Sequence, residues 1–143
     1  MEVREVASWD KPVPAGGNVV GEFWSAAAQG RLLIQRCPAC GGRQFYPRPV
    51  CVTCGADPEW EEASGRGVVH TFTVIRQNGA RPFRDELPYV VAMIELAEGP
   101  RMMGNVTGCA PDDVTVGMPV VAYAVVAEEG LAVPFWEPVA ASG

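Results

Sequence analysis

Short runs of apolar residues, separated by turn residues, dominate the second half of the chain. Runs of this length with Val, Ile, Thr and aromatic residues are typical of β-strands. Five follow one another: Gly67–Ile75, Tyr89–Leu96, Arg101–Gly108, Pro119–Ala127 and Leu131–Val139. Short strands joined mostly by tight turns predict a small antiparallel barrel of the OB type, with a five-stranded sandwich as the competing architecture.

The first half of the chain reads differently. Residues 1–17 end in the Pro- and Gly-rich stretch KPVPAGG and predict an extended or flexible tail. Asn18 is a possible N-cap for a helix over Val19–Gln29, which Gly30 would end. The large aromatic side chains of Phe23 and Trp24 on so short a helix need a cover, for which we favour the protein's own core over a partner subunit. Arg31–Arg36 predicts a strand.

Four of the five cysteines form two C-x-x-C pairs, CPACG and CVTCG. The pairs are Cys37 with Cys40 and Cys51 with Cys54. Gly41 and Gly55 follow each second cysteine, where a metal knuckle tends to need a positive φ. This spacing predicts a tetrahedral four-thiolate metal site with zinc as the metal, and iron in an electron carrier as the minor alternative.

Four thiolates fill a tetrahedral coordination sphere and leave no position for water or substrate. The predicted metal is therefore structural, one ion per chain, and stabilises a segment too rich in loops to bury enough surface by itself.

Composition argues against nucleic-acid binding, membrane insertion and export. The chain has 143 residues and a formal net charge of -6, which lowers the expectation of nucleic-acid binding because the phosphate backbone is repelled. No apolar run has membrane length, and the first nine residues carry charges where an export signal would be apolar. We therefore expect a cytoplasmic protein with reduced thiols.

A catalytic constellation is hard to assemble from this sequence. His70 is the chain's one histidine, and it falls in a predicted strand beside Val68, Phe72 and Val74, which favours a structural role. Cys109 has no partner at a motif spacing, and Asp112 and Asp113 fall in a predicted turn. These observations favour a binding or scaffolding subunit over an enzyme.

The long connection RQNGARPFRDELP after the first predicted barrel strand is the strongest candidate site outside the cysteines. OB barrels bind ligands with this loop. Arg76, Arg81 and Arg84 beside Phe83 could hold a phosphorylated ligand. The alternative is a solvated loop in which these arginines pair with Asp85 and Glu86.

Taken together, the order of elements resembles the family catalogued as domain of unknown function 35, a rubredoxin-like zinc ribbon followed by an OB-fold. The matching stretches are FWSAAAQGRLLIQRCPACG, YPRPVCVTCG, SGRGVVHTFTV, LPYVVAMIELAEGPRMMGNV and VGMPVVAYAVV. The resemblance implies a mainly β fold with the tail at 1–17, the helix and first strand at 18–36, the ribbon at 37–62 and the barrel at 63–140.

The resemblance also implies a function. Members are thought to be non-catalytic partners of thiolase-like enzymes, such as thiolases, acyl-CoA synthases and steroid side-chain retro-aldolases, or of hydratases. They are thought to help enclose the CoA thioester. We accordingly expect a heterotetramer of two chains each, with contacts to the acyl-CoA or the partner from Phe45, Tyr46 and Arg48 in the ribbon and from Arg76, Arg81, Phe83 and Arg84 in the long loop.

Two positions depart from the family pattern: Tyr46 stands where relatives have the first proline of a Pro-Pro-Arg segment, and Arg76 stands where they often have histidine. A nucleic-acid-binding ribbon and barrel is the second hypothesis, although the predicted strands offer Val, Met, Ala and Ile where such a protein would need interleaved aromatic and cationic residues.

Overall fold

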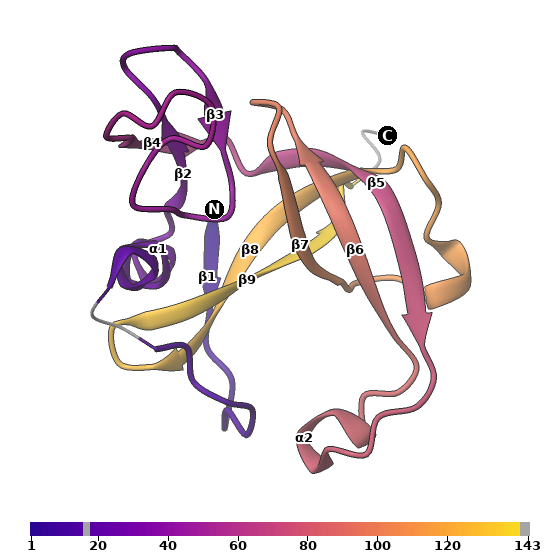
Figure 1. Cartoon of the computed structure of the whole chain (residues 1–143). Coiled ribbons are helices and arrows are strands. Elements are labelled where there is room, and N and C mark those ends of the chain that lie inside the picture. Colours follow the sequence, from indigo (N-terminus) through magenta and orange to yellow (C-terminus); the bar gives the residue numbers. More distant parts are fainter. Residues whose placement is uncertain (16–17, 141–143) are drawn as a thin grey trace.

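The computed structural model describes residues 1–15 and 18–140, and it places a metal-knuckle module and a helix against a barrel (Figure 1). Its helices are α1 (Val19–Ala28) and the single turn α2 (Arg81–Arg84), with a 3₁₀ turn at Pro111–Asp113. The strands are β1 (Glu2–Arg4), β2 (Leu32–Arg36), β3 (Arg43–Gln44), β4 (Glu59–Ala63), β5 (Arg66–Ile75), β6 (Tyr89–Leu96), β7 (Arg101–Val106), β8 (Pro119–Glu128) and β9 (Leu131–Pro138). Within the described residues, no helix is long and apolar enough to cross a membrane.

The barrel is built from β5 to β9, in the spatial order β8-β5-β6-β7-β9, and the pairing of β9 with β8 closes it within the described residues. Side chains alternate along β6, so that Val90, Ala92, Ile94 and Leu96 point inward and are buried. Closure of these strands confirms the predicted OB barrel over the sandwich, and the five predicted strands agree with the observed ones to within two residues at each end.

The helix α1 begins at Val19 as the sequence predicts and ends at Ala28, one residue before the predicted end. The side chain of Asn18 accepts a hydrogen bond from the backbone N–H of Val20 at 3.0 Å, which satisfies one free donor of the first turn. Gly30 follows the helix at φ +77°. Phe23 is 2 % exposed, and it shares one continuous core with Leu32 of β2 and the fully buried Trp136 of β9. The expected intramolecular cover is confirmed for Phe23, whereas Trp24 is half-buried and packs against the edge of the same core.

The N-terminal segment differs from the prediction of a free tail. β1 pairs in parallel with β8, Glu2 opposite Tyr123, and the Met1 ammonium donates to the carbonyl of Gly30 at 2.7 Å. Arg4 also forms an ion pair with Glu137 of β9, with Nη2 and Oε1 2.7 Å apart. The flexible tail is therefore wrong for these residues, since the edge of β8 offers free backbone groups that the extended segment pairs with. Residues 16–17 of the predicted tail lie outside the described residues.

Two further expectations change with the structure. The ribbon sheet has the order β3-β2-β4 within the described residues, so β2 belongs to the ribbon and the expected boundary between residues 36 and 37 divides that sheet.

In β5 the register shifts between Val69 and Thr71, which leaves His70 at a bulge and exposed. His70 is therefore not packed with Val68, Phe72 and Val74, and Val69 is the buried residue of that stretch.

Candidate metal centre and ligand cavity

The four predicted cysteines come together at the tip of the ribbon, and their sulfurs all lie within 4.8 Å of one another. Both C-x-x-C turns close in the same way. The N–H of Gly41 donates to the carbonyl of Cys37 at 2.8 Å, and that of Gly55 to the carbonyl of Cys51 at 2.9 Å. Gly41 and Gly55 have φ of +75° and +78°, so the positive φ expected at these positions is confirmed.

Backbone N–H groups stabilise negative charge on the sulfurs, which is the form that binds a metal cation. The N–H groups of Gly42 and Thr53 point at Cys40 Sγ and Cys51 Sγ, each at 3.4 Å. The N–H groups of Cys54 and Thr53 lower the pKa of the Cys51 thiol to about 6. The N–H of Ala56 favours the Cys54 thiolate too. The sulfur of Cys37, then burial, and then the other two sulfurs outweigh it and raise the pKa of Cys54 to about 12. Four thiolates so close together need a positive ion between them.

The donor set fits zinc. Sulfurs bound tetrahedrally at about 2.3 Å from a zinc ion stand about 3.8 Å apart. The Sγ atoms of Cys37 and Cys54 are 3.5 Å apart, and those of Cys40 and Cys51 are 3.7 Å apart. The ligands would fill the coordination sphere, so the metal holds the ribbon together and offers no open position for chemistry.

Beneath the metal, a buried glutamine holds the loop between the two knuckles. Gln35 of β2 is 4 % exposed; its Oε1 accepts from the backbone N–H of Arg48 at 2.8 Å, and its Nε2 donates to the carbonyl of Arg48 at 2.9 Å. The same Oε1 accepts from Gln44 Nε2 at 2.8 Å. Gln44 in turn accepts from the N–H of Val52 at 3.0 Å. The loop that carries Phe45 and Tyr46 is therefore fixed by side-chain bonds as well as by the metal.

We predict that Gln35→Leu lowers the free energy of unfolding by about 1–3 kcal/mol, because it leaves both backbone groups of Arg48 and one donor of Gln44 unsatisfied. Chemical denaturation measures the loss, and the zinc content should stay stoichiometric. The control is Gln77→Leu, at an exposed loop position, which should change the unfolding free energy little. Equal stability of the two variants would contradict the role assigned to Gln35.

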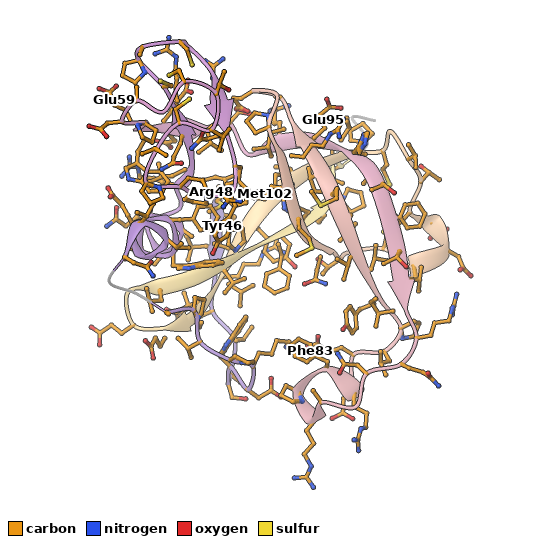
Figure 2. All side chains as sticks on the ribbon, in the orientation of Figure 1. Tyr46, Arg48, Glu59, Phe83, Glu95 and Met102 are labelled. Atoms are coloured by element: carbon orange, nitrogen blue, oxygen red, sulfur yellow. The ribbon has the colours of Figure 1, made fainter. Side chains whose placement is uncertain are left out.

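A cavity of about 390 Å³ lies where α1 and the ribbon loop face the barrel. Its walls come from α1, the ribbon loop, α2, β6, β7 and β9. The lining residues are Phe23, Trp24, Phe45, Tyr46, Phe83, Tyr89, Val91, Met102, Met103, Gly104, Asn105, Val133 and Pro134. Figure 2 shows Tyr46 close to Met102 at the junction of ribbon and barrel, with Phe83 farther down on α2.

Aromatic rings form two groups in the cavity wall. On the ribbon side, Phe23 meets Trp24 edge-on with ring centroids 4.8 Å apart, and Phe23 and Phe45 are 5.3 Å apart. Phe45 then meets Tyr46 edge-on at 5.5 Å. On the α2 side, Phe83 and Tyr89 have their centroids 6.2 Å apart. Packing of this kind holds large apolar side chains in fixed positions around the cavity.

The predicted contact residues separate into two sets. Phe45, Tyr46 and Phe83 line the cavity, whereas the four arginines predicted with them do not and are exposed: Arg48, Arg76, Arg81 and Arg84. Arg84 donates to the carbonyl of Gly79 at 2.9 Å. Glu86, which the sequence offers as a partner for these arginines, instead pairs with Lys11 at 2.6 Å.

Sequence reasoning misses part of the cavity wall. The sequence pattern assigns Phe23 and Trp24 to the core side of the helix, and it assigns the tyrosine and methionines at 89, 102 and 103 to strands with no further role. The signal that could have found them is local: Phe23 and Trp24 are adjacent, and adjacent helical side chains point in different directions. The two rings therefore cannot both point into the protein core. Phe23 is buried in the core, and Trp24 is the half-buried one.

Comparison with known proteins gives the family. Residues 24–61 match the model of the ChsH2 rubredoxin-like zinc ribbon domain, and residues 60–125 match that of the ChsH2 C-terminal OB-fold domain. The chain belongs to the ChsH2 (DUF35) family. Membership confirms the resemblance predicted from the motifs, and the zinc-ribbon match together with the cysteine cluster confirms zinc as the metal.

Three relatives show how far the likeness extends. The chain is 40 % identical over 129 residues to a probable enoyl-CoA hydratase alpha subunit of Thermomonospora curvata, covering 90 % of this chain and 40 % of that subunit. It is 37 % identical over 102 residues to a DUF35 domain-containing scaffold protein of Methanothermobacter thermautotrophicus, 69 % of this chain and 76 % of that protein. A solved chain of the Ltp2-ChsH2(DUF35) aldolase superposes with a TM-score of 0.77 at 40 % identity, covering 87 % of this chain and 98 % of that one. The chain thus spans less than half of the hydratase subunit but nearly all of the aldolase chain.

Proposed function

We propose that this protein is a non-catalytic accessory subunit that binds a thiolase-like enzyme and helps to bind or enclose its acyl-CoA substrate. The observation that carries the proposal is the match to a chain of the Ltp2-ChsH2(DUF35) aldolase, which covers 98 % of that chain at 40 % identity. That aldolase is named for two components, Ltp2 and ChsH2(DUF35), and the family models that match this chain are those of ChsH2 domains.

The geometry supports a role in binding. The coordination set of four cysteines leaves the metal no substrate position, and the ribbon it stabilises carries Phe45 and Tyr46 into the wall of the cavity. The cavity lies over β6 and β7, the second and third strands of the barrel, and this is the face on which OB-folds bind their ligands.

We further propose two copies of this chain with two copies of the enzyme, and a CoA thioester as the shared ligand. The partner class covers thiolases, acyl-CoA synthases and retro-aldolases of steroid side chains. The relative named a probable enoyl-CoA hydratase alpha subunit supports a link to the enzymes of CoA thioesters.

The test is co-expression with each thiolase-like protein of the source organism. A true partner should co-elute with this chain at equal stoichiometry, and its soluble yield and acyl-CoA turnover should depend on the chain. The mass of the complex by multi-angle light scattering should be that of two chains of each kind. Full activity and solubility of every thiolase-like candidate without this chain would refute the proposal.

Arg81→Ala and Arg84→Ala are predicted to leave the fold intact and to weaken CoA-ester binding or lower the partner's rate. Both arginines are exposed on α2, on either side of Phe83, so they can reach phosphates outside the cavity. Each loss should be about three- to tenfold, since exposed charge contacts are screened by salt. The comparison variant is Arg66→Ala, an exposed arginine at the start of β5, and activity equal to wild type in both α2 variants would remove the loop from the site.

A further inference from the structure

The wall of the 390 Å³ cavity carries no charge. Among the described residues that line it, the side chains are aromatic, aliphatic or thioether, with Asn105 as the one amide. Phosphate groups need cations or several N–H donors to replace their hydration. The nucleotide half of a CoA ester, with its three phosphates, would therefore lose free energy on entering this cavity.

Two polar groups of the wall are engaged within the protein. The hydroxyl of Tyr89 accepts from Asn78 Nδ2 at 2.9 Å, and Asn105 Nδ2 donates to the carbonyl of Val90 at 3.0 Å. A ligand in the cavity consequently contacts mainly apolar surface. The binding free energy gained by hydrocarbon there is proportional to the apolar area that it buries.

The size and position of the cavity fit a small-molecule group. Its volume lies within the range of roughly 300–1,000 Å³ that is usual for ligand pockets. Phe83 on one side and the cluster of Phe23, Phe45 and Tyr46 on the other are anchored in different elements. The ribbon, held by its metal, and the barrel thus form facing walls around one apolar space.

We propose that this cavity binds the acyl group of a CoA thioester and leaves the nucleotide outside. The inference rests on the proposed function, which supplies the CoA thioester, and adds which part of that molecule the chain recognises. The uncharged wall selects the acyl group over the phosphates. An apolar side chain of the partner enzyme is the other possible occupant, and a binding experiment with matched variants separates the two.

The experiment uses the isolated, zinc-loaded full chain and isothermal titration calorimetry with three probes: octanoyl-CoA, S-octanoyl-pantetheine and free CoA. Octanoyl-pantetheine keeps the acyl group and lacks the nucleotide. We expect both octanoyl compounds to bind with comparable affinity, and free CoA to bind at least about tenfold more weakly because it brings no hydrocarbon to the cavity.

Two variants test the location. Val91→Phe puts a larger side chain into the cavity from β6 and should weaken octanoyl-pantetheine binding about tenfold. Its matched control is Met93→Phe, which lies on the same face of the same strand, is half-buried as Val91 is, and does not line the cavity. Phe83→Ala removes a wall residue from α2, where no strand pairing is at risk, and should weaken the same probe several-fold. Unchanged zinc content and denaturation midpoints verify the fold of each variant.

Three results would overturn the inference. These are binding of free CoA as tight as that of octanoyl-CoA, equal effects of Val91→Phe and Met93→Phe, or no octanoyl binding to the isolated chain at concentrations up to the probe's solubility. If Val91→Phe instead prevents co-elution with the partner and leaves octanoyl binding unchanged, the cavity receives a protein side chain and the inference is equally overturned. In each of these cases the accessory function would still stand if the partner's solubility and turnover continue to depend on the chain.

Discussion

Cys37→Ser is expected to abolish stoichiometric zinc binding and to unfold the ribbon. Cys37 is 1 % exposed, and its sulfur is 3.5 Å from that of Cys54, so a hydroxyl there removes a ligand in the interior of the cluster. Metal binding contributes about 10–16 kcal/mol to folding in zinc-finger peptides, and the ribbon's own sheet includes β3, which has 2 residues. Because Phe23 and Leu32 join the ribbon side to the barrel core, we also expect a lower denaturation midpoint for the whole chain.

Zinc content by mass spectrometry and thermal denaturation by circular dichroism measure both effects. Cys109→Ser is the control, since the fifth cysteine lies outside the cluster and is half-buried shortly after the end of β7. That variant should keep its zinc and most of its stability. If Cys37→Ser retained one zinc per chain and melted as wild type does, the four-thiolate site would be wrong.

Gly67→Ala is expected to lower the free energy of unfolding by about 2–3 kcal/mol. A Cβ at residue 67 would stand 2.7 Å from the carbonyl oxygen of Glu95 and 2.7 Å from Ile94 Cγ2, both on the neighbouring strand β6. The carbonyl belongs to the paired backbone, so it cannot move aside as the end of a flexible side chain could. In the variant, β5 and β6 must therefore separate locally, and this separation strains the first residues of the barrel.

Urea denaturation of Gly67→Ala and Gly79→Ala compares this position with a matched glycine. A Cβ at Gly79 meets no atom within 4 Å, and its φ is not in the positive range, so that variant should be as stable as wild type or slightly more stable. Equal denaturation midpoints for the two variants would show that β5 and β6 do not approach each other so closely at this point.

Gly65 and Gly67 also explain the SGRG motif, Ser64–Gly67, which is one of the stretches that resemble the family. Gly65 has φ +79°, a backbone conformation that favours glycine, and Gly67 allows the close approach to Glu95. Between them the chain leaves the ribbon and enters the barrel, and the carboxylate of Glu98 accepts from the N–H of Ser64 at 2.6 Å. The motif is therefore the junction between the two modules.

The barrel and the metal ligands could be predicted because their signals are local. Alternation along β6 and the two C-x-x-C pairs each lie within a few consecutive residues. The strands β1 and β4 could not be predicted in this way. β1 has 3 residues and depends on β8, more than a hundred residues later, and β4 reads EWEEA, whose charges obscure a strand that pairs with β2.

The cavity could be predicted only in part for a similar reason. Phe45, Tyr46 and Phe83 stand out by their neighbours in the sequence, as aromatic residues beside arginines. Their meeting with Trp24 and Met103 depends on how α1 and the ribbon pack against β7, and no pattern within a single segment reports that packing. The neighbouring arginines are more prominent in the sequence, but their side chains are exposed to solvent and do not line the cavity.

The closure of the barrel has a consequence for its dynamics. In the described structure β7 meets β9 through the parallel pair of Val106 and Trp136, whereas β8 and β9 are paired along most of their length. The barrel wall thus has a seam, and the cavity lies along it, with Gly104 on one side and Pro134 on the other. Local opening costs least where the fewest hydrogen bonds must break. The β7–β9 contact can therefore open locally while β5, β6 and β8 keep their register. Under the proposed acyl-binding role, such opening would let the cavity take acyl groups of different girth.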